Sequence, residues 1–225
     1  MNFQAIPVVA YIFFGLFLLF SIIHLVFCYL ENEKWRKLTK CFTTLALGIA
    51  AVITIPQSPL VYLGVFFGML GDFCLLKKHK VWPFVGGMVS FLINHILYIV
   101  MFMMLCGPLH YGFYVATGLY VVLFPLLFYQ VGRKIIHQRH LAFGGTFYFA
   151  FLVLDFIWAV IACAQGNVDF CLLAAFGAAC FIISDIFLAY TLFKKNIKRR
   201  DFYIMATYLL AQGLIVVGFV FTILK

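Results

Sequence analysis

The chain has 225 residues, of which 66% are hydrophobic and only 10% are charged. A water-soluble domain of this size cannot bury so much apolar surface, so a soluble globular protein is excluded. Apolar runs long enough to cross the hydrocarbon core of a bilayer recur along the chain. The sequence therefore predicts an all-α, multi-pass integral membrane protein in which residues 1–225 form a single domain.

Eight transmembrane helices in one bundle are predicted, at about 7–30, 38–55, 60–76, 82–105, 111–131, 141–164, 170–193 and 202–224. The second and third spans are separated only by "IPQSPL", which contains Pro56 and Pro59. Proline ends a helix and restricts the residue before it. We therefore expect two helices joined by a tight turn; a single kinked helix, which gives seven spans, is the alternative.

Positive charges are confined to alternate loops. Of the 16 Lys and Arg residues, all but Lys225 lie in the first, third, fifth and seventh loops between the predicted spans. The positive-inside rule places these odd-numbered loops in the cytosol and both termini on the opposite side. Seven spans would break this alternation, so the charges favour eight. The net charge of +9 is accordingly interpreted as membrane topology and not as a nucleic-acid-binding surface.

Two similar apolar stretches each contain one aspartate: "FFGMLGDFCLL" contains Asp72 and "CFIISDIFLAY" contains Asp185. A pair of lysines follows each, and "FLINH" at 91–95 then resembles "YLLAQ" at 208–212. Both aspartate helices run in the same direction across the membrane. The pattern indicates two four-helix repeats in parallel orientation.

Both aspartates fall in the cytosolic half of the membrane, roughly 8 and 13 Å from its boundary at 1.5 Å per residue. An ionisable side chain there costs about 2.5–3.5 kcal/mol and normally faces the bundle interior, so it indicates a functional site. A structural role is the alternative: an aspartate can cap a helix break at Gly71 or pair with Lys40. A third intramembrane carboxylate, Asp155 in "LVLDFIWA", is interpreted as a packing or pairing residue.

Polar residues also gather in the fourth and eighth spans. Asn94, His95 and Tyr98 lie on or beside one face of the fourth span, and Tyr208 and Gln212 form the matching pair in the eighth. We expect these side chains to line a pocket, although a buried histidine bonded to a neighbour is the common alternative. None of the histidines has the spacing of a metal site, and no phosphate-binding glycine loop or nucleophile elbow is present in the sequence.

The series "GVFFGMLGDFCLL", "FVGGMVSFLINHILYI", "FIISDIFLAY" and "YLLAQGLIVVG" resembles the YhhN-like family, whose animal members are called transmembrane protein 86. The resemblance extends over nearly the whole chain. It implies a lysoplasmalogenase, which hydrolyses the vinyl ether bond of lysoplasmalogens to a fatty aldehyde and glycerophosphocholine or glycerophosphoethanolamine. The motif aspartates of the family correspond to Asp72 and Asp185. No family motif corresponds to Asp155.

This resemblance gives the two aspartates a chemical role. Protonation of a vinyl ether at its β-carbon creates an oxocarbenium ion, which water captures at the α-carbon. Two carboxyl groups supply the proton donor, the base and the negative charge, as in glycosidases. Two acids in one low-dielectric pocket do not both ionise readily, so one should stay protonated. No metal or organic cofactor is required.

The resemblance and the polar pattern together define a predicted site. Asp72 and Asp185 are the expected catalytic residues. The residues expected to bind the lysophospholipid substrate are Lys40, Asn94, His95, Tyr98, Ser184, Tyr208 and Gln212. The substrate phosphate is expected near Lys40, Lys77 and Lys78.

Other functions remain open at this point. Intramembrane carboxylates and internal repeats also occur in proton-coupled transporters of small molecules or lipids, which are the main alternative. A zinc-dependent lipid hydrolase, an intramembrane aspartyl protease and a non-catalytic lipid-binding protein are further alternatives. The membrane is expected to be the endoplasmic reticulum in a eukaryote and the inner membrane in a bacterium.

Overall fold

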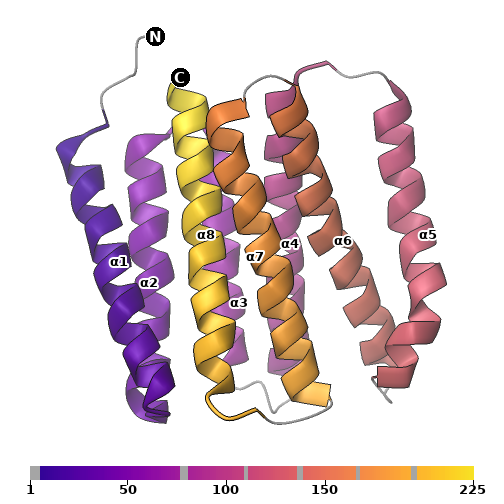
Figure 1. Cartoon of the computed structure of the whole chain (residues 1–225), viewed down its shortest axis with the longest axis horizontal. Coiled ribbons are helices and arrows are strands. Elements are labelled where there is room, and N and C mark those ends of the chain that lie inside the picture. The colour runs from indigo at the N-terminus through magenta and orange to yellow at the C-terminus, as the bar shows by residue number, and fades with distance from the viewer. Residues whose placement is uncertain (1–5, 77–80, 109–110, 136–138, 166–167, 194–196) are drawn as a thin grey trace.

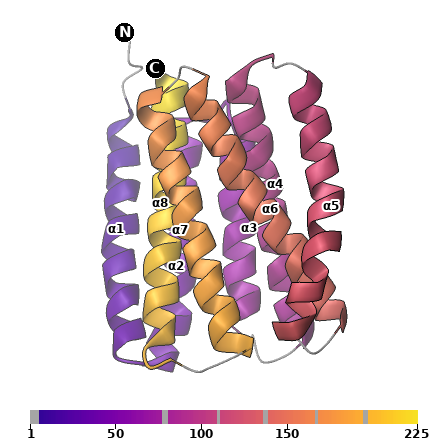
Figure 2. The same ribbon diagram turned by 45° about the vertical axis from the view of Figure 1, so that its right-hand side comes forward.

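The computed structural model describes residues 6–76, 81–108, 111–135, 139–165, 168–193 and 197–225. Within these residues the chain forms eight helices that run up and down side by side (Figures 1 and 2). They are α1 (Val8–Tyr29), α2 (Glu33–Thr54), α3 (Pro59–Leu75), α4 (Val81–Cys106), α5 (Tyr111–Ile135), α6 (Arg139–Ala164), α7 (Val168–Phe193) and α8 (Arg200–Leu224). The predicted all-α membrane bundle is confirmed.

The stretch between α2 and α3 separates two helices. α2 ends at Thr54, and Pro59 is in the first turn of α3, where its missing N–H has no intrahelical partner to lose. The alternative of one kinked helix is therefore wrong. α3 has only 17 residues, or about 26 Å at 1.5 Å per residue. Among the described helices, the other seven are long and apolar enough to cross a membrane.

Two helices, α2 and α5, extend furthest past the predicted spans. α2 begins at Glu33 because the side chain of Asn32 caps it, accepting the backbone N–H of Trp35 at 3.3 Å. α5 continues to Ile135, through the basic residues that follow its apolar part. A capped or charged turn remains helical outside the hydrocarbon region, so hydropathy marks the edge of the membrane and not the end of the helix.

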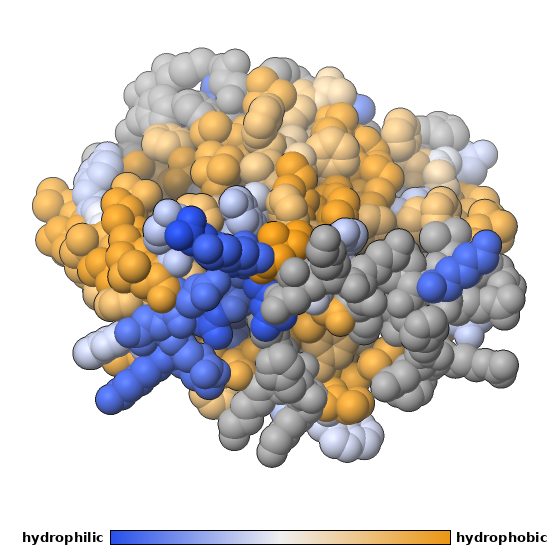
Figure 3. Space-filling model, turned by 60° about the horizontal axis from the view of Figure 1, so that its bottom comes forward, coloured by the Kyte–Doolittle hydropathy of each residue, from blue (hydrophilic) through white to orange (hydrophobic). Residues whose placement is uncertain are grey.

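The chain reverses at two ends of different chemistry. The first turns of α2 and α8 lie together with the last turns of α1, α3 and α7, and both termini lie at the opposite end (Figure 1). We call the first of these the basic end; its described cations include Lys34, Arg36, Lys37, Lys40, Lys198, Arg199 and Arg200. Hydrophilic side chains gather there, and apolar residues cover the flanks of the bundle (Figure 3). Residues 77–80 and 194–196, which complete two of the basic loops, lie outside the described residues.

The centre of the bundle is formed by α8, which packs most extensively against α7 and also contacts α1, α2 and α3. α4 packs against α3 and α6, while α5, at the edge of the bundle, packs closely only on α6 among the described helices (Figure 2). α4 and α8 thus have different neighbours, although they are equivalent in the predicted repeat. The two halves are not packed alike, and the parallel repeat stays a prediction.

A glycine allows α3 and α4 to approach closely beside Asp72. A Cβ atom at Gly71 would lie 2.6 Å from Cε2 of Phe91, a ring carbon on α4. Such small residues permit close helix packing in membranes. Gly71 therefore fixes how α4 lies against the part of α3 that carries Asp72.

The shared location of the basic turns predicts the orientation of the bundle. Single cysteines introduced at Lys34 and Lys198, in a variant lacking reactive native cysteines, should be labelled from the cytosolic side by a membrane-impermeant maleimide. A cysteine at Lys225 should be labelled only from the opposite side, because positive loops are retained in the cytosol. Labelling of all three positions from one side would contradict this topology.

Candidate active site

Asp72 and Asp185 line the same cavity near the basic end of the bundle. The cavity has a volume of about 60 Å³. The residues around it come from α2, α3, α4, α7 and α8; they are Lys40, Asp72, Leu75, Phe91, Ser184, Asp185, Leu188, Asp201, Ile204, Met205 and Tyr208. Folding thus brings together two carboxyl groups that are far apart in the sequence, in a space bordered by apolar side chains.

Asp72 is buried and forms an ion pair with a lysine of the neighbouring helix. Its Oδ1 lies 3.0 Å from Nζ of Lys40, which extends from the second turn of α2. The aliphatic part of a lysine can cover apolar surface while its ammonium reaches a polar partner. The sequence analysis gave this ion pair as a structural alternative for Asp72. In the structure Asp72 forms the pair and also lines the cavity. Tyr208 lies beside Asp72 and lines the same space.

Asp185 is partly buried and has a neutral partner. The hydroxyl of Tyr148, on α6, donates a hydrogen bond to its Oδ2. The preceding residue, Ser184, donates through its Oγ to the backbone carbonyl of Ile204 at 3.0 Å, which ties α7 to α8. Tyr148 was not predicted as a site residue, because nothing in "GTFYFAF" distinguishes it from the aromatic residues around it.

The predicted substrate-binding residues divide into two groups. Lys40, Ser184 and Tyr208 line the cavity with the aspartates. Asn94, His95, Tyr98 and Gln212 are fully buried outside its lining. Lys77 and Lys78, expected near the phosphate, lie outside the described residues.

Three of the buried group form hydrogen bonds between helices. Nδ2 of Asn94 donates to the carbonyl of Gly64 at 2.7 Å and joins α4 to α3. The hydroxyl of Tyr98 donates to Oε1 of Gln212 at 2.8 Å and joins α4 to α8. In this structure these side chains position helices around the cavity.

His95 is bonded to the third intramembrane carboxylate. Its Nδ1–H donates to Oδ2 of Asp155 at 2.9 Å, and both side chains are fully buried. The His95 ring also packs edge-on against Phe181, with centroids 4.5 Å apart. The bond joins α4 to α6, which agrees with the interpretation of Asp155 as a pairing residue.

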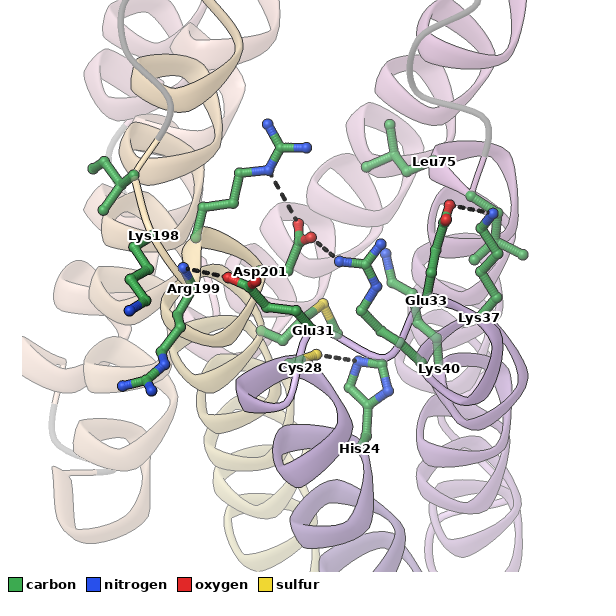
Figure 4. Close-up of a pocket in the computed structure, with 15 residues that line it drawn as sticks. His24, Cys28, Glu31, Glu33, Lys37, Lys40, Leu75, Lys198, Arg199 and Asp201 are labelled. Carbon is green, nitrogen blue, oxygen red and sulfur yellow. Dashed lines mark hydrogen bonds and ion pairs between the residues drawn. The ribbon is translucent and has the colours of Figure 1, made fainter.

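A second, larger pocket adjoins the cavity at the basic end. It has a volume of about 430 Å³ and shares Lys40, Leu75, Asp201 and Met205 with the inner cavity. It lies between the first turns of α2 and the start of α8, with His24 and Cys28 from the last turns of α1 (Figure 4). The inner cavity with the two aspartates and the charged outer pocket are therefore neighbours, separated only by the side chains that line both.

Comparison with known proteins gives a consistent result. A model of the YhhN family matches residues 35–219. Lysoplasmalogenase TMEM86A of Homo sapiens is 30% identical over 181 residues, which cover 76% of this chain and 69% of the human protein. Lysoplasmalogenase TMEM86A of Bos taurus is 31% identical over 179 residues, with the same coverage. No solved structure matches the chain.

The His95–Asp155 pair predicts a coupled effect on stability. Replacing either partner by leucine leaves the other buried and unpaired, so His95→Leu and Asp155→Leu should each lower the free energy of unfolding by about 1–3 kcal/mol. The double variant should recover part of that loss, because it leaves neither group unsatisfied. Unfolding in a mild detergent measures this cycle. Purely additive losses would show that the two side chains are not coupled.

Proposed function

Because the chain belongs to the YhhN family, we propose that it is a lysoplasmalogenase that hydrolyses the vinyl ether bond of lysoplasmalogens. The products are a fatty aldehyde and glycerophosphocholine or glycerophosphoethanolamine. The names of the curated relatives support a hydrolase acting on a lipid. The observation that carries the proposal is that Asp72 and Asp185 line one small cavity, which also has apolar walls.

The different partners of the two aspartates support different roles. Asp72 forms an ion pair with the ammonium group of Lys40 at 3.0 Å, which supports a role as the carboxylate that accepts a proton. The described hydrogen-bond partner of Asp185 is the hydroxyl of Tyr148, and among the described residues Asp185 has no ion-pair partner, which supports a role as the proton donor. We assign Asp185 as the general acid and Asp72 as the general base.

Hydrolysis then proceeds with a balanced transfer of protons. Asp185 protonates the β-carbon, and the carboxylate of Asp72 stabilises the oxocarbenium ion that forms. Water attacks the α-carbon and gives a proton to Asp72. As the hemiacetal collapses, its hydroxyl proton returns to Asp185, and Asp72 protonates the departing glycerol oxygen. Both residues regain their starting states, and one water molecule is consumed.

Substrate selectivity tests this chemistry directly. Purified protein should release aldehyde from an alkenyl lysophospholipid and leave the alkyl ether analogue intact, because only the alkenyl group can be protonated to a stabilised cation. Aldehyde and fatty acid release are measured by mass spectrometry, with the acyl lysophospholipid as a third substrate. Equal turnover of the acyl compound would indicate an esterase. Proton-coupled uptake into vesicles without product would indicate the transporter.

The two aspartates should act as a unit. Asp72→Asn and Asp185→Asn should each lower turnover by about 10²–10⁴-fold, since an amide neither donates an acidic proton nor accepts one. The double variant should be little worse than either single one. Aldehyde release is compared with the folded fraction, measured by size-exclusion chromatography, and Asp155→Asn serves as the control that should be milder. Folded single variants that keep more than about a tenth of the wild-type rate would show that the aspartates are structural.

A further inference from the structure

We propose that the outer pocket at the basic end binds the zwitterionic phosphodiester headgroup of the lysolipid, with the phosphate among the lysines and arginines of α2 and α8 and the ammonium group toward Glu31 and Glu33. This inference rests on the proposed function, because it assigns the headgroup site of the same substrate. The cations at the first turns of α2 and the start of α8 extend the predicted phosphate site beyond Lys40.

The volumes of the inner cavity and the outer pocket suit different parts of the substrate. The inner cavity, at about 60 Å³, is too small for a phosphodiester and its alcohol, whereas the outer pocket has about 430 Å³. The two share four lining residues, including Lys40. A headgroup in the outer pocket therefore lies next to the carboxyl groups and not in their place.

The charges around the outer pocket suit an anion. Six Lys or Arg side chains and three carboxylates line it; the cations are Arg36, Lys37, Lys40, Lys198, Arg199 and Arg200. His24 adds no charge in this arrangement. The Thr39 hydroxyl donates to the Trp35 carbonyl at 2.8 Å, so it accepts from Nδ1–H of His24 at 2.8 Å and leaves Nε2 as an acceptor for the Cys28 thiol. The surplus of positive charge remains after the internal ion pairs are formed.

The charged side chains of the outer pocket lie at different depths, as their exposed fractions show. On the polar face of α2, the exposed fraction of the side chain falls from 67% at Glu33 and 44% at Lys37 to 22% at Arg36. It falls further to 13% at Lys40, and to 2% at Asp72, the ion-pair partner of Lys40. From solvent inward, the order is carboxylate, cations, then the proposed catalytic carboxylate. A lysoplasmalogen presents the complementary order of ammonium, phosphate and vinyl ether.

Two loop contacts hold the walls of the pocket together. The Glu31 carboxylate accepts the backbone N–H of Arg199 at 3.1 Å (Figure 4). The Arg199 guanidinium lies 3.8 Å from the ring centroid of Tyr29. Glu31 and Arg199 both have positive φ, at 54° and 57°, which is uncommon for residues other than glycine. Arg36 of α2 also pairs with Asp201 of α8. Contacts of the residue after α1 and of α2 with the start of α8 thus hold the outer pocket together at the basic end.

Binding of uncleaved analogues tests the headgroup site separately from catalysis. The probes are 1-alkyl-glycero-3-phosphocholine and 1-alkylglycerol, which differ only in the phosphocholine group and have no vinyl ether to hydrolyse. Affinities are measured by calorimetry with the protein in nanodiscs. Lys37→Gln combined with Lys198→Gln should weaken binding of the phosphocholine compound by about three- to tenfold, as expected for partly exposed charge contacts, and leave binding of 1-alkylglycerol unchanged.

A matched variant controls for the loss of two charges. Lys34→Gln combined with Lys134→Gln removes two exposed lysines that lie outside the pocket, and it should bind both probes as the wild type does. Glu33→Gln should weaken phosphocholine binding but not binding of 1-alkyl-glycero-3-phosphate, which lacks the ammonium group. Free glycerophosphocholine is a third probe; if it binds as tightly as the phosphocholine lipid, the pocket recognises the free phosphodiester and not a lipid headgroup, which overturns the proposal.

The remaining outcomes separate the two proposals. Equal loss of affinity in the pocket variant and the matched control, or equal loss for both alkyl probes, would overturn the headgroup site even if aldehyde release is observed. Selective loss of phosphocholine binding, in a protein that releases no aldehyde from alkenyl lysolipid, would support the headgroup site while contradicting the proposed hydrolysis.

Discussion

The Lys40–Asp72 ion pair is the interaction on which the candidate site depends, because it allows a carboxylate to be buried in a membrane bundle while it faces a cavity. An isolated charge in such surroundings is costly and is normally paired. Here the partner comes from α2 and the carboxylate from α3. The short helix α3 and the tight turn after Thr54 place the two side chains at the same depth. The proline-containing turn thus makes α2 and α3 neighbours, and this pairing brings Lys40 next to Asp72.

Three other described carboxylates also have polar partners, and each of the three joins a different pair of helices. Asp155 accepts from His95 and joins α6 to α4. Asp185 accepts from Tyr148 and joins α7 to α6, and Asp201 pairs with Arg36 and joins α8 to α2. Apolar packing alone gives little preference for one helix neighbour over another in lipid, where the tails are as apolar as the side chains. These carboxylates thus help to specify which helices meet, and Asp185 and Asp201 line, together with Asp72, the cavity where chemistry is proposed.

The number of helices could be predicted from the sequence, and Lys40 was already a possible partner of Asp72. Tyr148, the partner of Asp185, could not be predicted. Pro56 and Pro59 and the confinement of basic residues to alternate loops were sufficient to divide the apolar chain into eight helices. Helical spacing also showed that residues such as His95 and Tyr98 share a face. It did not show which helix that face meets, so residues that bond α4 to α3, α6 and α8 were expected to line a pocket. Tyr148 was missed for the same reason, since its role depends on the placement of α6 beside α7.

The surroundings of the intramembrane carboxylates explain why the candidate site is at one end of the bundle and not at mid-membrane. Asp155, the carboxylate of the central region, is fully buried and bonded to His95, whose ring packs against Phe181. It is absent from the lining of both described pockets. Asp72 and Asp185 lie close to the basic end, where an amphiphile can keep its charged group in water-accessible surroundings while its ether bond enters an apolar cavity.

Protonation of carbon gives a cation that a low-dielectric site with a fixed carboxylate stabilises more strongly than water does. In the proposed reaction water must also reach the α-carbon, and the polar pocket that adjoins the cavity offers a route for it. In the proposed reaction, a lysolipid with its headgroup at this end would place its phosphate among the cations and its vinyl ether beside Asp72 and Asp185.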